Sequence, residues 1–216
     1  MKPKVQSKRH CTEPSIKLLC MNVRGLNQDK KQKHVQDICN SEQIDIMLLC
    51  ETKLTRVLNL QGLSVQQSIH QRNGGCAVAS ATKLHKVKSL GTYLCWTKTL
   101  LRNTWVHVIS CYLQPGEQRH LRERAKRVIE IVDDLVKQDG QAVVILGGDF
   151  NNHIPNVETE CLRLNMHKAF DDGVASHVKG NLLDQVFVRN AQIDRAVMSG
   201  EIDLKVSDHR CLRVEL

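Results

Sequence analysis

Polar residues stand where several short apolar runs of this 216-residue chain end. Four of them lie at the end of such a run or just beyond it: Asn22, Glu51, Tyr112 and Asp149. Asn151 follows Asp149 by two positions, so in an extended segment both side chains point the same way. Strand ends can carry functional groups without breaking the core, and the repetition therefore indicates one polar site.

Three more candidates lie towards the end of the chain. Asp184 is an acid inside the apolar run NLLDQVFV, a position that usually means pairing with a cation or a histidine. Asp208 and His209 stand together before the last apolar run. A histidine with two carboxylates available favours a functional role over a structural one.

These residue types suit metal-assisted hydrolysis of a phosphodiester. Glu51 offers the hard oxygen ligand that Mg²⁺ prefers. In such a reaction one carboxylate positions or deprotonates water, a metal and a histidine neutralise phosphate charge, and a second carboxylate orients the histidine. The sequence contains no GxxxxGK[ST] phosphate cradle, no GxSxG elbow and no Cys/His cluster with zinc spacing.

Most of these residues also have a structural interpretation. Asn22 taken alone is a turn residue, Tyr112 a core or rim tyrosine, and Asn151 an Asx-turn former. His209 alone, like the nine other histidines, would be structural. Glu51 is different because it directly follows an apolar run, where an acid without a partner is costly.

The composition favours a polyanionic partner. Lys and Arg number 31 against 23 Asp and Glu, which gives a net charge of +8 and a pI near 9.1. Nucleic acid is the first candidate and an anionic membrane surface the second. Aromatic residues make up only 3% of the chain, which argues against a base-stacking single-strand binder. No run approaches the roughly 20 apolar residues of a membrane span.

The cysteines indicate a reducing compartment. None of the nine forms a CxxC pair, their number is odd, and several lie in apolar runs, so we expect small buried side chains rather than disulfides. Residues 1–15 are predicted to be a basic, flexible arm without the apolar region of a secretory signal. We expect an intracellular protein, nuclear if its source is a eukaryote.

The apolar pattern predicts one α/β domain over residues 16–216. Strands at 16–21 and 44–50 enclose a helix, and this order predicts a parallel βαβ pair. Alternating runs between 63 and 112 predict a mostly antiparallel meander. That first helix would be capped by Asn27 or Asp29 and would bury Val35, Ile38 and Cys39.

The rest of the chain contains the clearest helix, at 118–136, with Gly140 after it and Lys and Arg on a solvated outer face. Further strands are predicted at 142–146, 183–188 and 210–216, and a short helix near 156–164. No linker or repeat divides the chain.

Six segments, taken in order, resemble a known family: LCMNVRGLN, IDIMLLCETKL, SCYLQP, VVILGGDFNNHIP, NLLDQVFV and KVSDHRCL. They are similar to the endonuclease/exonuclease/phosphatase superfamily, most closely to the apurinic-type endonuclease domains of non-LTR retrotransposons. The resemblance covers roughly residues 16–216. It implies a four-layered α/β sandwich, with two mainly antiparallel sheets flanked by helices, which differs from the parallel start that the pattern predicts.

The resemblance also implies a metal site. Glu51 would be the principal Mg²⁺ ligand, with Asn22 beside it, and Asp208 would lie in the outer shell of the metal. Mn²⁺ would substitute for Mg²⁺.

The catalytic roles are implied in the same way. Asp149 would orient or activate the attacking water, and Asn151 would hold the nucleophile and a phosphate oxygen. Tyr112 would contact the scissile phosphate. His209 would donate to that phosphate, with Asp184 fixing its orientation.

The function implied is an Mg²⁺-dependent endonuclease that nicks double-stranded DNA and leaves 3′-hydroxyl and 5′-phosphate ends. A reverse transcriptase encoded by the same element is a candidate partner. The alternatives are a phosphatase or lipid phosphodiesterase of the same fold, or an inactive DNA-binding remnant. Where the family usually carries a threonine, this chain has GVASHVKGN, with Ser176 and His177. Target sequence and oligomeric state stay open.

Overall fold

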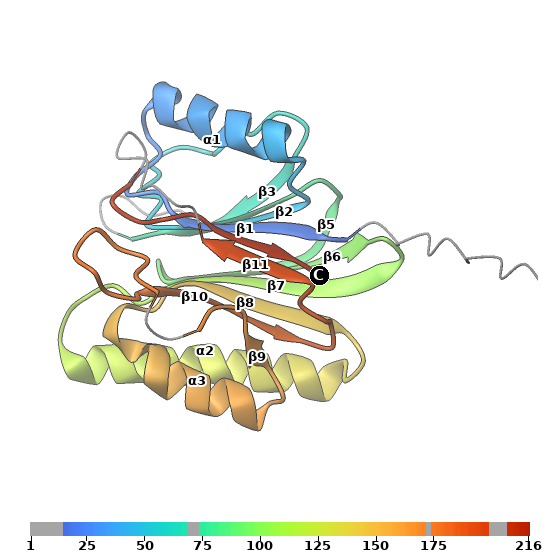
Figure 1. Ribbon diagram of the computed structural model, residues 1–216, viewed down its shortest axis with the longest axis vertical. Coiled ribbons are helices and arrows are strands. Elements are labelled where there is room, and N and C mark those ends of the chain that lie inside the picture. The colour runs from blue at the N-terminus through green and yellow to red at the C-terminus, as the bar shows by residue number, and fades with distance from the viewer. Residues whose placement is uncertain (1–14, 69–73, 172–173, 199–206) are drawn as a thin grey trace, which may run out of the picture.

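The computed structural model describes residues 15–68, 74–171, 174–198 and 207–216. In these residues two six-stranded sheets face each other, and helices cover both outer faces (Figure 1). The predicted four-layered α/β sandwich with mainly antiparallel sheets is therefore confirmed. The predicted arm over residues 1–15 lies, except for its last residue, outside the described part of the chain.

Each sheet combines segments that are distant in sequence. The first sheet contains, from edge to edge, β11 (Arg195–Met198), β12 (Leu212–Glu215), β1 (Lys17–Asn22), β2 (Ile46–Cys50), β4 (Cys76–Ser80) and β3 (Ser64–Gln67). The second contains β5 (Leu84–Leu90), β6 (Leu94–Leu101), β7 (Thr104–Tyr112), β8 (Val143–Asp149), β10 (Asp184–Arg189) and β9 (His167–Lys168).

Helices form the two outer layers. The helix α1 (Asp29–Glu42) covers the first sheet, and α2 (Gln118–Gln138) and α3 (Ile154–Arg163) cover the second (Figure 1). A short 3₁₀ turn, η1 (Asn151–His153), connects β8 to α3. No helix in the described ranges is both long and apolar enough to cross a membrane.

Both sheets contain one parallel pair, and a helix makes each crossover. β1 pairs with β2 through α1, and β7 pairs with β8 through α2. The parallel βαβ start predicted from the pattern is therefore present within the mainly antiparallel sandwich. The predicted meander is divided, because β3 and β4 join the first sheet while β5, β6 and β7 join the second.

Two local features differ from the pattern for identifiable reasons. The helix α1 begins after Gln28, and no side chain caps it. Asn27 cannot serve as the cap because its side chain donates to the Lys53 carbonyl at 2.6 Å and accepts from the Thr55 amide at 3.1 Å. The pattern does not predict the strand β5, because five of its seven residues are exposed and it shows no alternation of apolar and polar positions.

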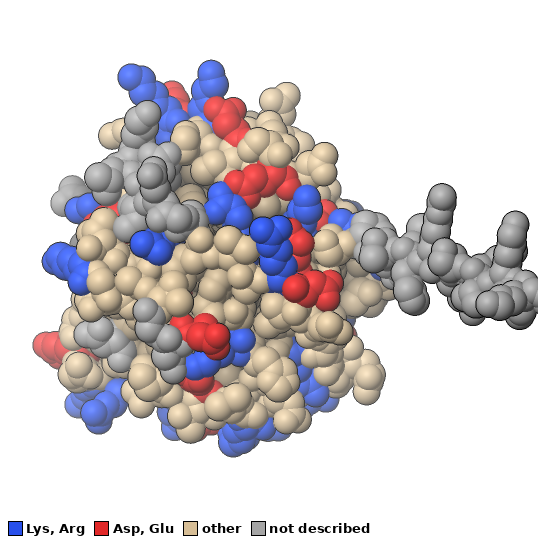
Figure 2. Space-filling view, in the orientation of Figure 1, with Lys and Arg blue, Asp and Glu red and all other residues tan. Residues whose placement is uncertain are grey.

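The apolar core has three parts, one between the sheets and one under each helical layer. Leu48 and Ile145 lie in the part between the sheets, Val35 and Leu49 under α1, and Phe187 under α2 and α3. All eight cysteines in the described ranges are free and buried, as the sequence predicts. On the face shown in Figure 2, Lys and Arg side chains are spread from the helical layers at the top and bottom to the middle of the molecule, where Asp and Glu side chains lie among them.

Two glycines let β8 lie close to its neighbours just before Asp149. A Cβ on Gly147 would lie 2.6 Å from Leu48 Cδ1 of the facing sheet. Gly148 has φ +150°, and a Cβ there would lie 1.8 Å from the Cys111 carbonyl oxygen on β7. The Gly-Gly pair therefore allows the backbone to deliver Asp149 at the sheet edge.

We predict that Gly148→Ala lowers the free energy of unfolding by about 2 kcal/mol or more, because the new methyl group meets backbone that cannot move without shifting β7. Urea denaturation followed by circular dichroism measures the change. Gly140→Ala is the matched control, since its Cβ would have the Val136 carbonyl oxygen at 3.6 Å as nearest neighbour, and it should stay within about 0.5 kcal/mol. Equal effects of the two substitutions would contradict this explanation.

Candidate active site

The candidate residues meet at one edge of the sandwich because of strand direction. Asn22 ends β1, and Glu51 directly follows the parallel strand β2. Tyr112 ends β7 and is in register with Asp149, the last residue of β8. β10 runs antiparallel to β8 and begins at this edge, so that Asp184 pairs in register with Asp149.

The Asn22 side chain joins the two sheets. Its amide donates to Glu51 Oε2 at 3.0 Å and to Asp149 Oδ2 at 2.8 Å. It also lies 3.5 Å from His209 Nε2. The Asn22 Oδ1 accepts the Arg24 amide at 2.9 Å, which fixes the side chain. Asn22 is fully buried and makes contacts to Glu51, Asp149 and His209 besides this Asx-turn bond, so the turn interpretation alone does not describe it.

His209 is held by a buried carboxylate. Its Nδ1 lies 2.6 Å from Asp184 Oδ2, and Ser176 Oγ donates to the same oxygen at 2.7 Å. Ser176 Oγ also accepts the amides of Leu183 and Asp184 at 2.9 and 3.0 Å. This arrangement fixes the ring and leaves Nε2 facing Asp149 Oδ2 at 3.9 Å.

The electrostatics keep His209 charged. Burial lowers the pKa of His209, but the hydrogen bond and charge of Asp184, with the charges of Asp149 and Asp208, raise it to about 9. Burial and the charge of Asp184 raise the pKa of Asp149 to about 7, against the opposing effect of His209. The site therefore holds an imidazolium beside a carboxyl group that can exchange a proton near neutral pH.

Asn151 supports Asp149 through its backbone. Its amide donates to Asp149 Oδ1 at 2.9 Å, and its side-chain Nδ2 donates to the Leu113 carbonyl at 2.9 Å. Asn151 has φ +50°, a conformation that Asn adopts more readily than most residues. These contacts place Asn151 beside Asp149 at the start of η1.

Glu51 faces cationic and hydroxyl groups. Lys53 Nζ lies 2.6 Å from Glu51 Oε1. Tyr112 is buried nearby, and this burial, together with the charges of Glu51 and Asp149, raises the pKa of its hydroxyl. The ammonium group of Lys53 shows that a cation fits against this carboxylate.

Asp208 is separated from the other two residues of the predicted metal set. Its Oδ2 pairs with Arg24 at 2.8 Å and lies 3.5 Å from His177 Nε2. Its Oδ1 lies 4.0 Å from His209 Nε2. Among the described residues it contacts neither Glu51 nor Asn22. The structure thus brings Glu51 and Asn22 into direct contact, whereas Asp208 reaches the site only near His209 Nε2.

The structure adds four residues to this site that are not among the site residues predicted from the sequence: Arg24, Lys53, Ser176 and His177. His177 is expected there to be structural, yet its ring packs edge-on against His209 at 4.7 Å, and the two residues form a β-bridge. Nothing in the periodicity marks Ser176 or His177, which lie in a loop seven or eight positions before Asp184. The departure of this segment from the family pattern is the only signal of them in the sequence.

Among the residues that the structure describes, two groups of His, Asp, Glu or Cys side chains could hold a metal ion. Asp149, Asp184 and His209 offer ligand atoms within 4.8 Å of one another, and so do His177, Asp208 and His209. His177 Nδ1 accepts the Lys179 amide at 3.1 Å, so the neutral ring carries its proton on Nε2 and donates towards Asp208. Hence the oxygen-rich side of the site, with Asp149 and Glu51, suits a hard cation better.

The comparisons with known proteins agree on the fold. The sequence profile of the Endonuclease/Exonuclease/phosphatase family matches residues 19–209. No curated protein matches the chain significantly. Among solved structures, a variant of the Neisseria 3′ phosphatase NExo bound to a product DNA hairpin is 16% identical, with a TM-score of 0.77 over 93% of this chain and 99% of that one.

Two other solved structures are similar at 16% identity. The endonuclease domain of TRAS1, a telomere-specific non-LTR retrotransposon, has a TM-score of 0.70 and covers 94% of this chain and 98% of that domain. An AP endonuclease from Archaeoglobus fulgidus also has a TM-score of 0.70, with coverage of 92% and 98%. At this identity the likeness establishes the shared fold.

We predict that Asp184→Asn lowers the pKa of His209 from about 9, because the hydrogen bond and charge of Asp184 are the largest effects that raise it, while Asp149 and Asp208 remain in place. NMR titration of the His209 ring in metal-free protein measures this. In the wild type the charged ring stabilises the fold below pH ~6.5, and this contribution is lost as the pH rises through 9. The exposed acid Asp194→Asn is the control; an unchanged His209 pKa in Asp184→Asn would contradict the assignment.

Proposed function

Because the chain belongs to the Endonuclease/Exonuclease/phosphatase family, we propose that it is an Mg²⁺-dependent DNA endonuclease that nicks one strand. The products are a 3′-hydroxyl and a 5′-phosphate. The observation that carries this proposal is the shared network in which Asn22 joins Glu51 to Asp149 while Asp184 orients His209.

The side chains divide the reaction between them. Asp149, whose pKa is near neutral, accepts a proton from the attacking water. The water oxygen bonds to phosphorus as the bond from phosphorus to the 3′ oxygen breaks, and the 3′ oxygen takes a proton from solvent to leave as a hydroxyl group. His209, held as an imidazolium by Asp184, donates to a phosphate oxygen on which charge accumulates. Asn151 and Tyr112 hold the phosphate beside these two groups.

Glu51 would hold the Mg²⁺ ion, with Asn22 beside it fixing the carboxylate, and Mn²⁺ would replace it. When bound, the ion supplies positive charge that offsets the charge of the phosphate. The space against Glu51 already accepts the cationic Lys53 ammonium group. Asp208 acts from a greater distance, through His209 and Arg24.

DNA is favoured as the substrate by charge and by the fold relatives. The net charge of +8 suits a polyanion. The Neisseria enzyme is bound to a DNA hairpin, and a D. rerio TDP2 structure contains a single-stranded DNA product. The TRAS1 domain supports an origin in a retrotransposon and a reverse transcriptase of the same element as partner.

A phosphatase is the second candidate, because the Neisseria relative is described as a 3′ phosphatase. The same side chains could hydrolyse a terminal phosphate, because none of the contacts in this network requires the phosphate group to carry a second ester bond. The inactive-remnant alternative is disfavoured because every side chain of the proposed mechanism meets at one edge.

We predict that the protein nicks supercoiled plasmid with Mg²⁺ and not with EDTA. Glu51→Ala, Asp149→Ala and His209→Ala should each reduce the rate by at least about a hundredfold, the scale for one acid–base or charge-stabilising group. Glu117→Ala, an exposed acid on the loop before α2, is the control. Phosphate release from inositol phosphates or 3′-phosphate ends without nicking would instead identify a phosphatase.

We also predict opposite effects of two neighbours on Mn²⁺ affinity measured by calorimetry. Glu51→Gln should weaken binding about tenfold or more, because it removes a charged ligand. Lys53→Met should strengthen it, because the ammonium group competes with the ion for Glu51 Oε1. If Glu51→Gln left the affinity unchanged, Glu51 would not be the principal ligand.

A further inference from the structure

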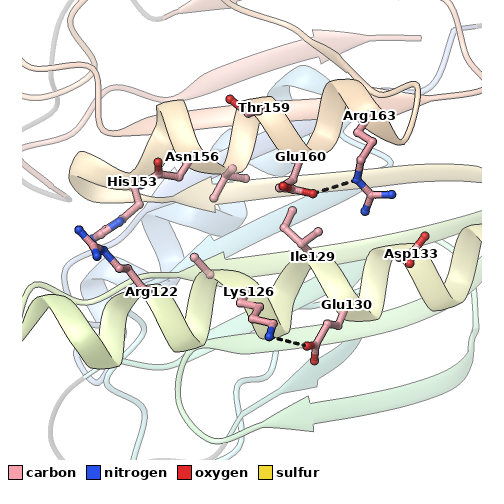
Figure 3. Close-up of a pocket in the computed structure, with 12 residues that line it drawn as sticks. Arg122, Lys126, Ile129, Glu130, Asp133, His153, Asn156, Thr159, Glu160 and Arg163 are labelled. Carbon is pink, nitrogen blue, oxygen red and sulfur yellow. Dashed lines mark hydrogen bonds and ion pairs between the residues drawn. The ribbon is translucent and has the colours of Figure 1, made fainter.

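A groove of about 600 Å³ runs between α2 and α3, outside the candidate active site (Figure 3). Its lining differs between the two ends. Arg122, His153 and Asn156 lie at one end, and Glu130, Asp133, Glu160 and Arg163 lie towards the other.

His153 is a buried side chain in need of a partner. It is 4% exposed and lines the groove, and its Nδ1 has no hydrogen-bond partner among the described residues. Buried polar atoms in folded proteins are nearly always paired, so an imidazole without a partner is unusual. Nδ1 is itself closed to solvent, so a ligand in the groove would meet the other ring nitrogen, Nε2. His153 is also the N-cap residue of α3 but makes no side-chain capping bond, so that purpose does not explain it.

Arg122 lacks an anionic partner at the same end of the groove. It pairs with no carboxylate of the described residues, whereas Arg163 pairs with Glu160 at 3.0 Å and Lys126 approaches Glu130 at 4.0 Å. Figure 3 places Arg122 and His153 at the same end of the groove that both line. A permanent cation and an unpaired imidazole at one end of a groove are complementary to an anion.

The charge order along α2 supports the same conclusion. Its first ten residues carry five Lys or Arg side chains and one acid, and its remaining eleven carry three acids and one lysine. This order opposes the helix dipole, which favours acids near the N-terminus and bases near the C-terminus. Four of these five cations have partners among the described residues: Arg119 pairs with Glu123, Arg124 lies over the Tyr93 ring, and Lys126 and Arg127 approach Glu130. Arg122 is the one of the five left for a negatively charged ligand. The N-terminus of α3 adds its own positive dipole end at His153.

We propose that Arg122, His153 and Asn156 form a phosphate-binding site that takes a backbone phosphate of the strand being cut. This inference rests on the proposed function. The turn η1 connects the two sites, because it begins at Asn151 beside Asp149 and ends at His153 in the groove. The Cα atoms of Asn151 and His153 are at most about 7 Å apart, so one bound strand reaches both. Arg122 donates to the phosphate oxygens, His153 adds a ring N–H, and Asn156 adds its amide.

The test compares Arg122→Ala with Arg127→Ala. Arg127 is an exposed arginine on the same helix that pairs with Glu130 and does not line the groove. Binding of a duplex oligonucleotide is measured in EDTA, without turnover, at several salt concentrations. For Arg122→Ala the slope of log affinity against log salt concentration should become shallower by about the amount expected for one lost phosphate contact, and the affinity should drop about fivefold. Arg127→Ala should change neither, and circular dichroism checks that both variants fold.

Each other outcome has a definite meaning. Equal losses in both variants would overturn the proposal in favour of general attraction by α2. Binding of inorganic phosphate is followed separately by NMR of His153. If Arg122→Ala loses this binding while the salt dependence of its DNA affinity is unchanged, the ligand is a free anion, and the proposal that the site binds a DNA backbone phosphate is wrong. Because binding is measured without cleavage, failure of the wild type to nick DNA would reject the proposed function without deciding this site.

Discussion

The structure depends on holding two buried carboxylates beside one imidazole. Asp149 and Asp184 are 2% and 1% exposed, and two like charges so placed are unfavourable without compensation. His209 supplies one positive charge, and Asn22, Ser176 and the Asn151 amide supply hydrogen bonds. Even so, burial and the charge of Asp184 keep the pKa of Asp149 raised, to about 7. The divalent cation of the proposed function would oppose both effects by adding positive charge at this edge.

The hydrogen-bond network around Asn22 and Asp149 joins the two sheets of the sandwich. Asn22 comes from the first sheet and Asp149 from the second, so the sheets must meet closely at this edge. Gly147 and Gly148 allow the close approach, and the parallel pairs bring Glu51 and Tyr112 to the same edge. The core between the sheets therefore also fixes the alignment of the site.

The fold alone does not choose among activities, since its relatives include AP endonucleases, 3′ phosphatases and a retrotransposon endonuclease domain. The features of this chain that bear on its activity are local. Arg24 and Lys53 place cations against Asp208 and Glu51, His177 packs on His209, and α2 carries its bases at the N-terminal end. Substrate choice should follow from these residues.

The sequence alone predicted most of the strands and helices, the burial of the cysteines and the polar residues at strand ends. These features could be predicted because apolar periodicity and strand termination are local properties of the sequence. The order of the motifs also supported the sandwich. Three features are decided only by the tertiary structure. The first is which sheet each strand of the 63–112 region joins, and the second is that Asn27 contacts a loop instead of capping α1. The third is the support that Ser176 gives to Asp184 and that His177 gives to His209. Those contacts join residues from different loops and sheets, and no local pattern encodes a hydrogen bond whose partners meet only after the two sheets have packed.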